Sequence, residues 1–127
     1  MVGAVEYQCL TAGTWTLTVE NGSNSNGSYE KFADGLMICT LDISVTDQAI
    51  ATAYGSLYRG ARTWTFPVAF VAAPVVTCGR FRWGTGASWP NVGATSATTA
   101  NLEGFDYTSR AVGTAVLISA IAIGRWK

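Results

Sequence analysis

Short stretches in which apolar and polar residues alternate follow one another along most of the chain. Trp15, Leu17 and Val19 alternate with polar residues near the start, and Trp64 and Phe66 alternate with threonines further on. A period of two is typical of half-buried β-strands. Turn signals recur roughly every 8 to 12 residues and no helical period is sustained, which is the spacing of an all-β sandwich or barrel. We therefore expect about seven or eight short strands in a single-domain, antiparallel β-sandwich.

The clearest local prediction is a β-hairpin with apolar arms at residues 29–32 and 36–43. Asp34 and Gly35 lie between the arms, and an Asp-Gly pair supplies the positive φ angles that a tight turn needs. Its role is structural, because the turn serves backbone geometry and the arms build a core or a contact between chains.

Other segments follow from the same signals. The run NGSNSNGS predicts turns because it holds two Asn-Gly pairs, and Pro67 predicts an edge strand or a strand end because proline cannot donate to a ladder. We expect further strands at 75–83, 92–100 and 113–126, loops at 84–91 and 102–112, and strand or loop at 45–56.

Composition limits the classes of partner. The chain has 127 residues, 49% apolar and only 13% charged, with eight Lys and Arg against eight Asp and Glu. A balanced charge gives no field to attract nucleic acid. The most apolar run, residues 115–123, is far shorter than the roughly 20 residues of a membrane helix, and the first residues lack the basic and apolar regions of a signal peptide. We expect no nucleic acid partner and no membrane insertion.

Catalytic candidates are scarce. The chain has no histidine, which excludes Ser-His-Asp and Cys-His arrangements. Glu103 and Asp106 form a close pair in sequence, and we interpret them as solvated loop carboxylates rather than the acid pair of a glycosidase. Cys9, Cys39 and Cys78 show neither a disulfide framework nor a zinc motif, so we expect buried thiols. We expect no enzymatic activity, no metal and no cofactor, and a polysaccharide-cleaving enzyme stays the least favoured reading.

Binding is better supported. Trp89 and Asn91 fall in an expected loop beside a strand that carries two arginines on one face. Exposed aromatic rings cover the C–H side of a sugar, while amides and guanidinium groups bind its hydroxyls. The alternatives without a binding role are a buried Trp89 and solvated or ion-paired arginines. The candidate ligand-binding residues are Trp89, Asn91, Arg80, Arg82, Tyr107 and Arg110.

Three motifs in order carry a resemblance to a known family. They are NSNGSYEKFADGLMIC, then TWTFPVAFVAAPVV, then AIAIGRWK. In this order they resemble the C-terminal domain of bacteriophage tail-fibre proteins of the gp53-like type, over residues 24–127. The matching positions are Tyr29, Lys31-Phe32 and Asp34-Gly35, then Phe66-Pro67, Phe70 and Pro74, then Ile121-Ala122-Ile123-Gly124. Ser28 replaces the usual glycine before the tyrosine, and Cys39-Thr40-Leu41 replaces an aromatic-Gly pair.

The resemblance implies a homotrimeric β-sandwich at the distal end of a phage fibre or spike, which binds the host cell surface, usually its glycans. It places the protein on the virion, outside the host cell when it functions. Residues 1–23 would form a strand or arm that docks onto other virion proteins through Val2, Val5 and Leu10. The alternative is a purely structural trimer, such as a virion decoration, head-spike or adaptor protein.

Overall fold

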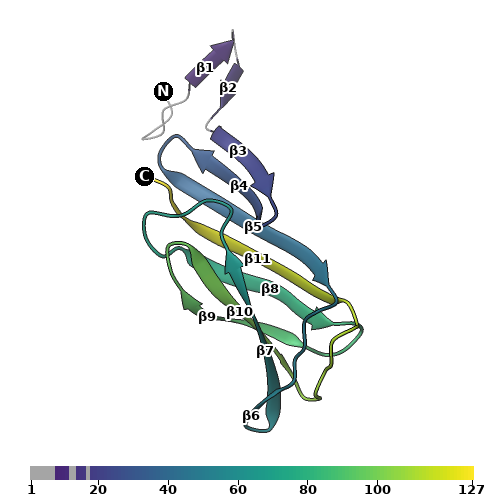
Figure 1. Cartoon of the computed structure of the whole chain (residues 1–127). Helices are drawn as coiled ribbons and strands as arrows, with labels where there is room; N and C mark the ends of the chain where they lie inside the picture. Colours follow the sequence, from purple (N-terminus) through teal and green to yellow (C-terminus); the bar gives the residue numbers. More distant parts are fainter. Residues whose placement is uncertain (1–7, 12–13, 17) are drawn as a thin grey trace.

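The computed structural model describes residues 8–11, 14–16 and 18–127, and this part of the chain is all β (Figure 1). The strands are, in chain order, β1 (Gln8–Thr11), β2 (Thr14–Thr16), β3 (Thr18–Asn24), β4 (Gly27–Phe32), β5 (Leu36–Val45), β6 (Thr52–Tyr54), β7 (Leu57–Thr65), β8 (Val75–Trp83), β9 (Trp89–Thr95), β10 (Thr99–Asp106) and β11 (Val116–Arg125). The predicted all-β class is confirmed, with more strands than expected.

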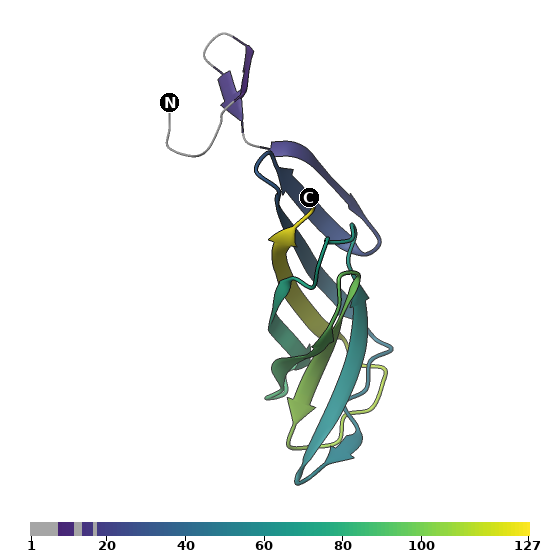
Figure 2. The same cartoon turned by 90° about the vertical axis from the view of Figure 1, so that its left-hand side faces the viewer.

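Two antiparallel sheets pack as a sandwich (Figure 2). One sheet has five strands in the order β3-β4-β5-β11-β8, and the other has four in the order β6-β7-β10-β9, while β1 and β2 form a separate small pair. Alternate residues of β5, β7, β8, β10 and β11 point into the space between the sheets. The largest fully buried side chains are Phe81, Met37, Ile50, Leu102, Ile118, Val116, Asp106 and Cys39.

The predicted hairpin is confirmed as β4 and β5. The Gly35 amide donates to the Phe32 carbonyl at 3.1 Å, and the Asp34 carboxylate accepts from the Leu36 amide at 3.0 Å. Only Gly35 of the turn has a positive φ, at 99°. A three-residue turn that ends on a left-handed glycine produces this geometry, so Gly35 rather than the Asp-Gly pair provides the left-handed residue.

The three motifs of the resemblance meet in space. The Trp126 amide donates to the Gly35 carbonyl, and its indole N–H donates to the Phe32 carbonyl at 2.9 Å. The C-terminal residues are thus hydrogen-bonded to the hairpin turn. A side chain at Gly124 would lie 2.8 Å from the Phe70 ring and 3.0 Å from Pro74. Glycine at this position therefore lets the middle motif pack closely against the last strand.

Several expected boundaries were wrong. Residues 21–24 belong to β3, because β4 pairs with them, and only the second Asn-Gly pair turns the chain at Ser25 and Asn26. The expected strand 92–100 is interrupted at 96–98, where Ser96 bonds to the backbone amides of Thr98 and Thr99. The expected loop 102–112 is strand β10 as far as Asp106. Residues 46–51 and β6 agree with the strand or loop expected there.

The N-terminal prediction lies partly outside the described residues, which exclude Val2, Val5 and Leu17. The strand β3 already belongs to the five-stranded sheet, and Val19 in it is exposed although its alternation predicted a half-buried position. Docking through residues 1–23 stays a prediction.

The thiols of Cys39 and Cys78 are buried, as expected, and unpaired. Burial raises the pKa of Cys39 to about 11, so this thiol is a core group rather than a nucleophile. The side chain of Cys9 lies outside the described ones. Within the described part of the chain, no helix is long and apolar enough to cross a membrane. No three His, Cys, Asp or Glu side chains gather there to hold a metal ion.

Candidate functional site

Aromatic side chains form a row across the outer face of the four-stranded sheet. Phe105 in β10 is the register partner of Trp89 in β9 on one side and of Arg59 in β7 on the other. Register partners project from the same face of a sheet, with Cβ atoms about 5 Å apart. Trp89 is 42% exposed, so its indole is open to a ligand.

Tyr54 at the end of β6 extends the row. Its ring meets the Phe105 ring edge to face, with centroids 5.5 Å apart, and the Arg59 guanidinium lies 5.0 Å from its centroid. The ring of Tyr54 is 53% exposed even though two neighbours hold it. We define these four side chains, Tyr54, Arg59, Trp89 and Phe105, as the aromatic row.

A buried carboxylate lies beside the aromatic row on the same face. Glu103 is only 9% exposed and accepts from the side-chain amides of Asn91 at 3.0 Å and Asn101 at 3.4 Å. Arg59 Nη1 lies 3.7 Å from Glu103 Oε2, the oxygen that also accepts from Asn101. The expectation of a solvated loop carboxylate was wrong, because Glu103 sits in β10 between two neighbouring strands. We call Glu103, Asn91 and Asn101 the amide cluster.

Small residues leave room for the amide cluster. A side chain at Gly93 would lie 3.1 Å from both the Asn101 amide and the Glu103 carboxylate. Ala61 is the register partner of Glu103 in β7 and adds only a methyl group. The small residues on β7 and β9 therefore leave the amide cluster uncovered on both sides.

The aromatic row lies toward the end of the sandwich that is remote from the chain's C-terminus. Tyr54 ends β6, Trp89 begins β9 and Phe105 lies near the end of β10, and these strand ends gather at the lower end in Figure 1. The end of β11 and Lys127 lie at the opposite end. The row thus faces outward at one extremity of an elongated domain.

The structure divides the predicted site residues among three places. Trp89 and Asn91 lie together on the outer face of the four-stranded sheet, although Trp89 begins a strand where a loop was expected. Arg80 and Arg82 lie on the outer face of the five-stranded sheet, opposite Ser119 and Leu117 of β11. Tyr107 and Arg110 lie in the connection between β10 and β11. They do not form one site.

Two of these arginines already have partners. Arg80 bonds to the Asp42 carboxylate at 3.1 Å and to the Ser119 hydroxyl at 3.2 Å. Arg82 donates to the carbonyls of Gly86 and Thr85, which fixes the turn after β8. Arg80 therefore matches the alternative reading of an ion-paired arginine, whereas Arg82 is an exposed strand residue that donates to backbone carbonyls.

Arg110 belongs to a buried cluster with Ser88, Asp106 and Trp83, which we call the latch. The Asp106 carboxylate is fully buried and accepts from Ser88 Oγ at 2.7 Å and Arg110 Nε at 3.0 Å. The Arg110 guanidinium covers the Trp83 ring at 4.7 Å. Burial alone would raise the pKa of Asp106, but these bonds and the Thr108 amide outweigh it and hold the pKa below its usual value. The latch stabilises the loops beneath the aromatic row, and Asp106, like Glu103, is not the solvated carboxylate that we expected.

The outer face of the five-stranded sheet carries an apolar patch. Ile123 in β11 is the register partner of Val75 in β8 and of Ile38 in β5, and Ile121 lies two residues before it. Val75 is 76% exposed. We define Val75, Ile38, Ile121 and Ile123 as the aliphatic patch.

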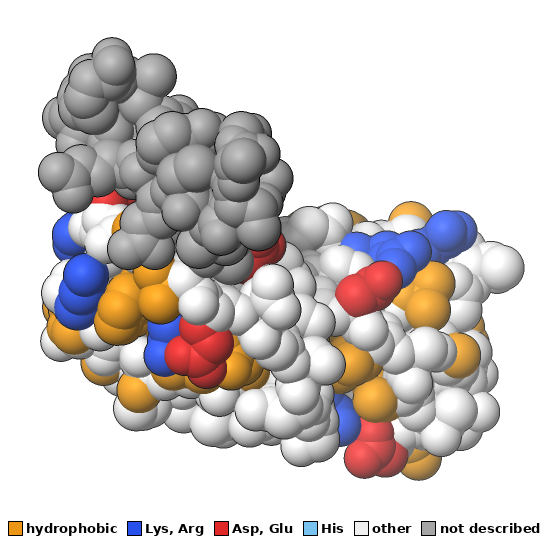
Figure 3. Space-filling model, turned by 90° about the horizontal axis from the view of Figure 1, so that it is seen from above, with side chains coloured by type: hydrophobic (Ala, Val, Ile, Leu, Met, Phe, Trp, Pro, Cys, Tyr) orange, Lys and Arg blue, Asp and Glu red, His pale blue; other side chains and the backbone are white. Residues whose placement is uncertain are grey.

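Viewed from above the domain, charged side chains of both signs lie near one another among hydrophobic and uncharged ones (Figure 3).

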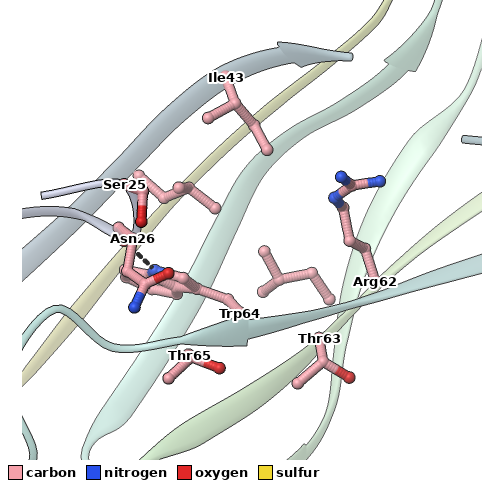
Figure 4. A pocket seen from close by; sticks show the side chains of 9 residues that line it. Ser25, Asn26, Ile43, Arg62, Thr63, Trp64 and Thr65 are labelled. Carbon is pink, nitrogen blue, oxygen red and sulfur yellow. Dashed lines mark hydrogen bonds between the residues drawn. The ribbon is translucent and has the colours of Figure 1, made fainter. Parts of the chain in front are cut away.

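A hollow of about 200 Å³ opens between the sheets beside the β3–β4 turn. Trp64 forms its floor and donates its indole N–H to the Asn26 carbonyl at 2.7 Å, while Arg62 and Ile43 line its other sides (Figure 4). Ligand pockets usually measure 300 to 1,000 Å³. The hollow is smaller, and its arginine already pairs with Asp47, so we prefer the outer face as the site.

The sequence reasoning missed Tyr54, Arg59, Asn101, Glu103 and Phe105. These residues come from three strands, and nothing local in the sequence shows that β6, β7 and β10 are neighbours of β9. A usable signal was present in β10, where Asn101, Glu103 and Phe105 alternate with apolar or small residues.

The fold is similar to that of two solved pyocin tail-fibre fragments. The Pseudomonas aeruginosa R1 pyocin fibre fragment of residues 323–701 matches with a TM-score of 0.57 and 22% identity, over 84% of this chain and 28% of the fragment. An N-truncated R1-type pyocin tail fibre matches with a TM-score of 0.58 and 22% identity, over 84% of this chain and 86% of that one. The predicted resemblance is confirmed at the level of the fold. No family model and no curated protein matches the chain.

Proposed function

We propose that this protein is a non-enzymatic virion component, the distal domain of a tail fibre or spike, and that it binds a host-surface glycan. The observation that carries the proposal is the aromatic row beside the amide cluster. Rings stack on the apolar face of a sugar, and positioned amides bind its hydroxyls. The shared fold of tail-fibre fragments supports the class of protein.

We further propose that the domain acts as a homotrimer. The aliphatic patch is a flat apolar surface on the sheet face remote from the aromatic row, so neighbouring copies can cover it without hiding the row. Three weak sites on one rigid tip bind jointly far more strongly than one site alone.

Binding of labelled protein to intact bacteria tests the proposal. A panel of strains should begin with Pseudomonas aeruginosa, the source of one of the similar fibres. Trp89→Ala should reduce binding at least tenfold, because covering one large apolar side chain contributes about 1.5 to 3 kcal/mol and three copies share the loss. Tyr107→Ala removes a ring outside the row that is more exposed than Trp89, and it serves as the control.

Equal binding by wild type and Trp89→Ala would contradict the proposed site. Loss of binding in both variants would point to the β10–β11 connection instead. Each variant should first show the wild-type mass in light scattering, so that a failure of assembly is not read as a failure of recognition.

The alternative function is purely structural. The aliphatic patch favours it, because an apolar face can equally dock onto another virion protein. A trimer that binds no strain, together with particles that fail to assemble when Ile123 is replaced by Asp, would establish this role. Release of reducing ends from host polysaccharide by the purified protein would instead establish an enzyme.

A further inference from the structure

We propose that the face formed by the aromatic row and the amide cluster selects uncharged pyranose units and discriminates against acidic sugars. This inference rests on the proposed function and names the ligand class of the same site. It also assigns a role to Glu103, which positions the two amides and sets the charge of the face.

The aromatic row provides the stacking surface. Phe105 is held between its register partner Trp89 and the Tyr54 ring. Trp89 and Tyr54 are both well exposed, while Phe105 is half-buried between them. A series of rings on a rigid sheet loses little conformational entropy when a ligand binds. This arrangement suits the C–H face of a pyranose ring, which carries no charge.

The amide cluster provides hydrogen-bonding groups of fixed orientation. Glu103 accepts one N–H from Asn91 and one from Asn101. A bond at the nitrogen of a planar amide turns its carbonyl oxygen away from Glu103, so each asparagine presents an acceptor and a second N–H to a ligand. Hydroxyl groups of a sugar match this mixture of donors and acceptors.

The charges of the face disfavour an anion. Along the outer face of β7, β10 and β9, the charged side chains are Arg59 and Glu103, which lie 3.7 Å apart. A sugar carboxylate that drew Arg59 toward itself would weaken this pair and leave a nearly buried carboxylate with less compensation. It would also lie close to the negative charge of Glu103. An uncharged sugar meets neither cost.

Matched sugar pairs test the selectivity. The methyl glycosides of glucose, galactose and mannose are compared with the methyl glycosides of the corresponding uronic acids, which differ at C6 alone. Binding to the full chain is followed by saturation-transfer NMR and by titration of tryptophan fluorescence. We expect at least one neutral glycoside to bind in the millimolar range, and its uronic acid about fivefold or more weakly at low salt. The difference should shrink as salt is added.

The Glu103→Gln variant separates positioning and charge from fold. Glutamine has only one acceptor oxygen, so it cannot bind both asparagine amides as Glu103 does, and the neutral glycoside should bind about threefold or more weakly. The loss of the negative charge should raise the affinity of the uronic acid relative to that of the neutral glycoside. The ratio of the two affinities is a readout that a merely structural role would not move. Trp89→Ala should weaken both sugars about tenfold, and Tyr107→Ala should change neither.

Three results would overturn the inference. They are equal or tighter binding of the uronic acids, an affinity ratio unchanged in Glu103→Gln, and no binding of any neutral glycoside at about 50 mM, well above the millimolar affinity expected. If cells still bind and Trp89→Ala abolishes that binding, the proposed function stands while the selectivity is wrong. If Trp89→Ala leaves cell binding intact, the proposed site itself has failed.

Discussion

The four-stranded sheet carries exposed aromatic side chains beside a buried carboxylate, whereas the five-stranded sheet carries exposed aliphatic side chains and exposed ion pairs. Glu103 is nearly inaccessible and holds two amides, while Asp42 is open to solvent and bonds to Arg80 and Ser119. The first arrangement holds two amides in fixed orientations, which suits the small ligand that we propose. The second presents a flat apolar area that suits a broad protein contact.

The two faces share one thin core, so each depends on the other for its geometry. Alternate residues of β10 supply the amide cluster outward and Leu102 and Gly104 inward, and alternate residues of β11 supply the aliphatic patch outward and Ile118 inward. The difference between the faces is therefore one of surface chemistry on a common scaffold, and substitutions can separate the two functions.

The largest effect should come from Gly104→Ala, which damages both faces together. An added Cβ would overlap the ring of Phe81, which is fully buried between the sheets. We expect a loss of at least about 3 kcal/mol in the free energy of unfolding, measured by urea denaturation. Gly79→Ala is the matched control, because its nearest contact is Ser119 at an ordinary 3.9 Å. Equal stability in both variants would contradict this account of the core.

Asp106→Asn should weaken the end of the domain that carries the aromatic row. An amide cannot accept from Ser88, Thr108 and Arg110 as the carboxylate does, and Arg110 is left uncompensated, so we expect about 2 to 3 kcal/mol of destabilisation. Thermal unfolding of variant and wild type measures it.

The same residue gives a pH dependence. The pKa of Asp106 is lowered in the folded state, so its contribution is complete above the unfolded value of about 3.9 and is lost as the pH falls through the lower folded value. Wild type should therefore lose stability below about pH 4 more steeply than Asp106→Asn. Parallel curves for the two proteins would assign the acid sensitivity to other carboxylates.

Ile121→Asp should disrupt the aliphatic patch and leave the proposed sugar site intact. Burying a carboxylate between copies costs far more than the apolar contact contributes, so we expect the proposed trimer to fall to monomer mass in light scattering. Methyl glycoside binding should not change, while cell binding should drop through lost avidity. Val112→Asp places the same charge at an exposed site in the β10–β11 connection and should keep the wild-type mass.

The local parts of the fold were predictable and the non-local parts were not. The β4–β5 hairpin followed from its own residues, because a glycine turn between apolar arms determines its partner. The pairing of β10 with β7 and β9 joins residues that lie up to about 50 positions apart, and no local signal encodes it. Glu103 and Asp106 were misplaced for this reason, since their burial depends on partners from other strands.

The site was predicted in part. Trp89 and Asn91 were found because an aromatic ring and an amide close together in an expected loop have the chemistry that binds sugars, and both lie on the proposed binding face. Arg110 was also predicted to bind sugar hydroxyls, but in the structure its guanidinium points inward and pairs with Asp106. Residue type thus identified which side chains can bind sugars, whereas the strand order determined which of them meet.

The smallest effect should come from Arg80→Ala, which tests the contrast between exposed and buried charges. Arg80 and Asp42 lie 3.1 Å apart, but both side chains are open to solvent. Water screens such a pair and both side chains lose entropy in forming it, so we expect less than about 0.5 kcal/mol of destabilisation in urea denaturation. A loss as large as that of Asp106→Asn would mean that Arg80 is covered in the assembled protein. In that case the trimer contact would extend from the aliphatic patch over the neighbouring ion pairs, and Arg80→Ala would also shift the trimer toward monomer.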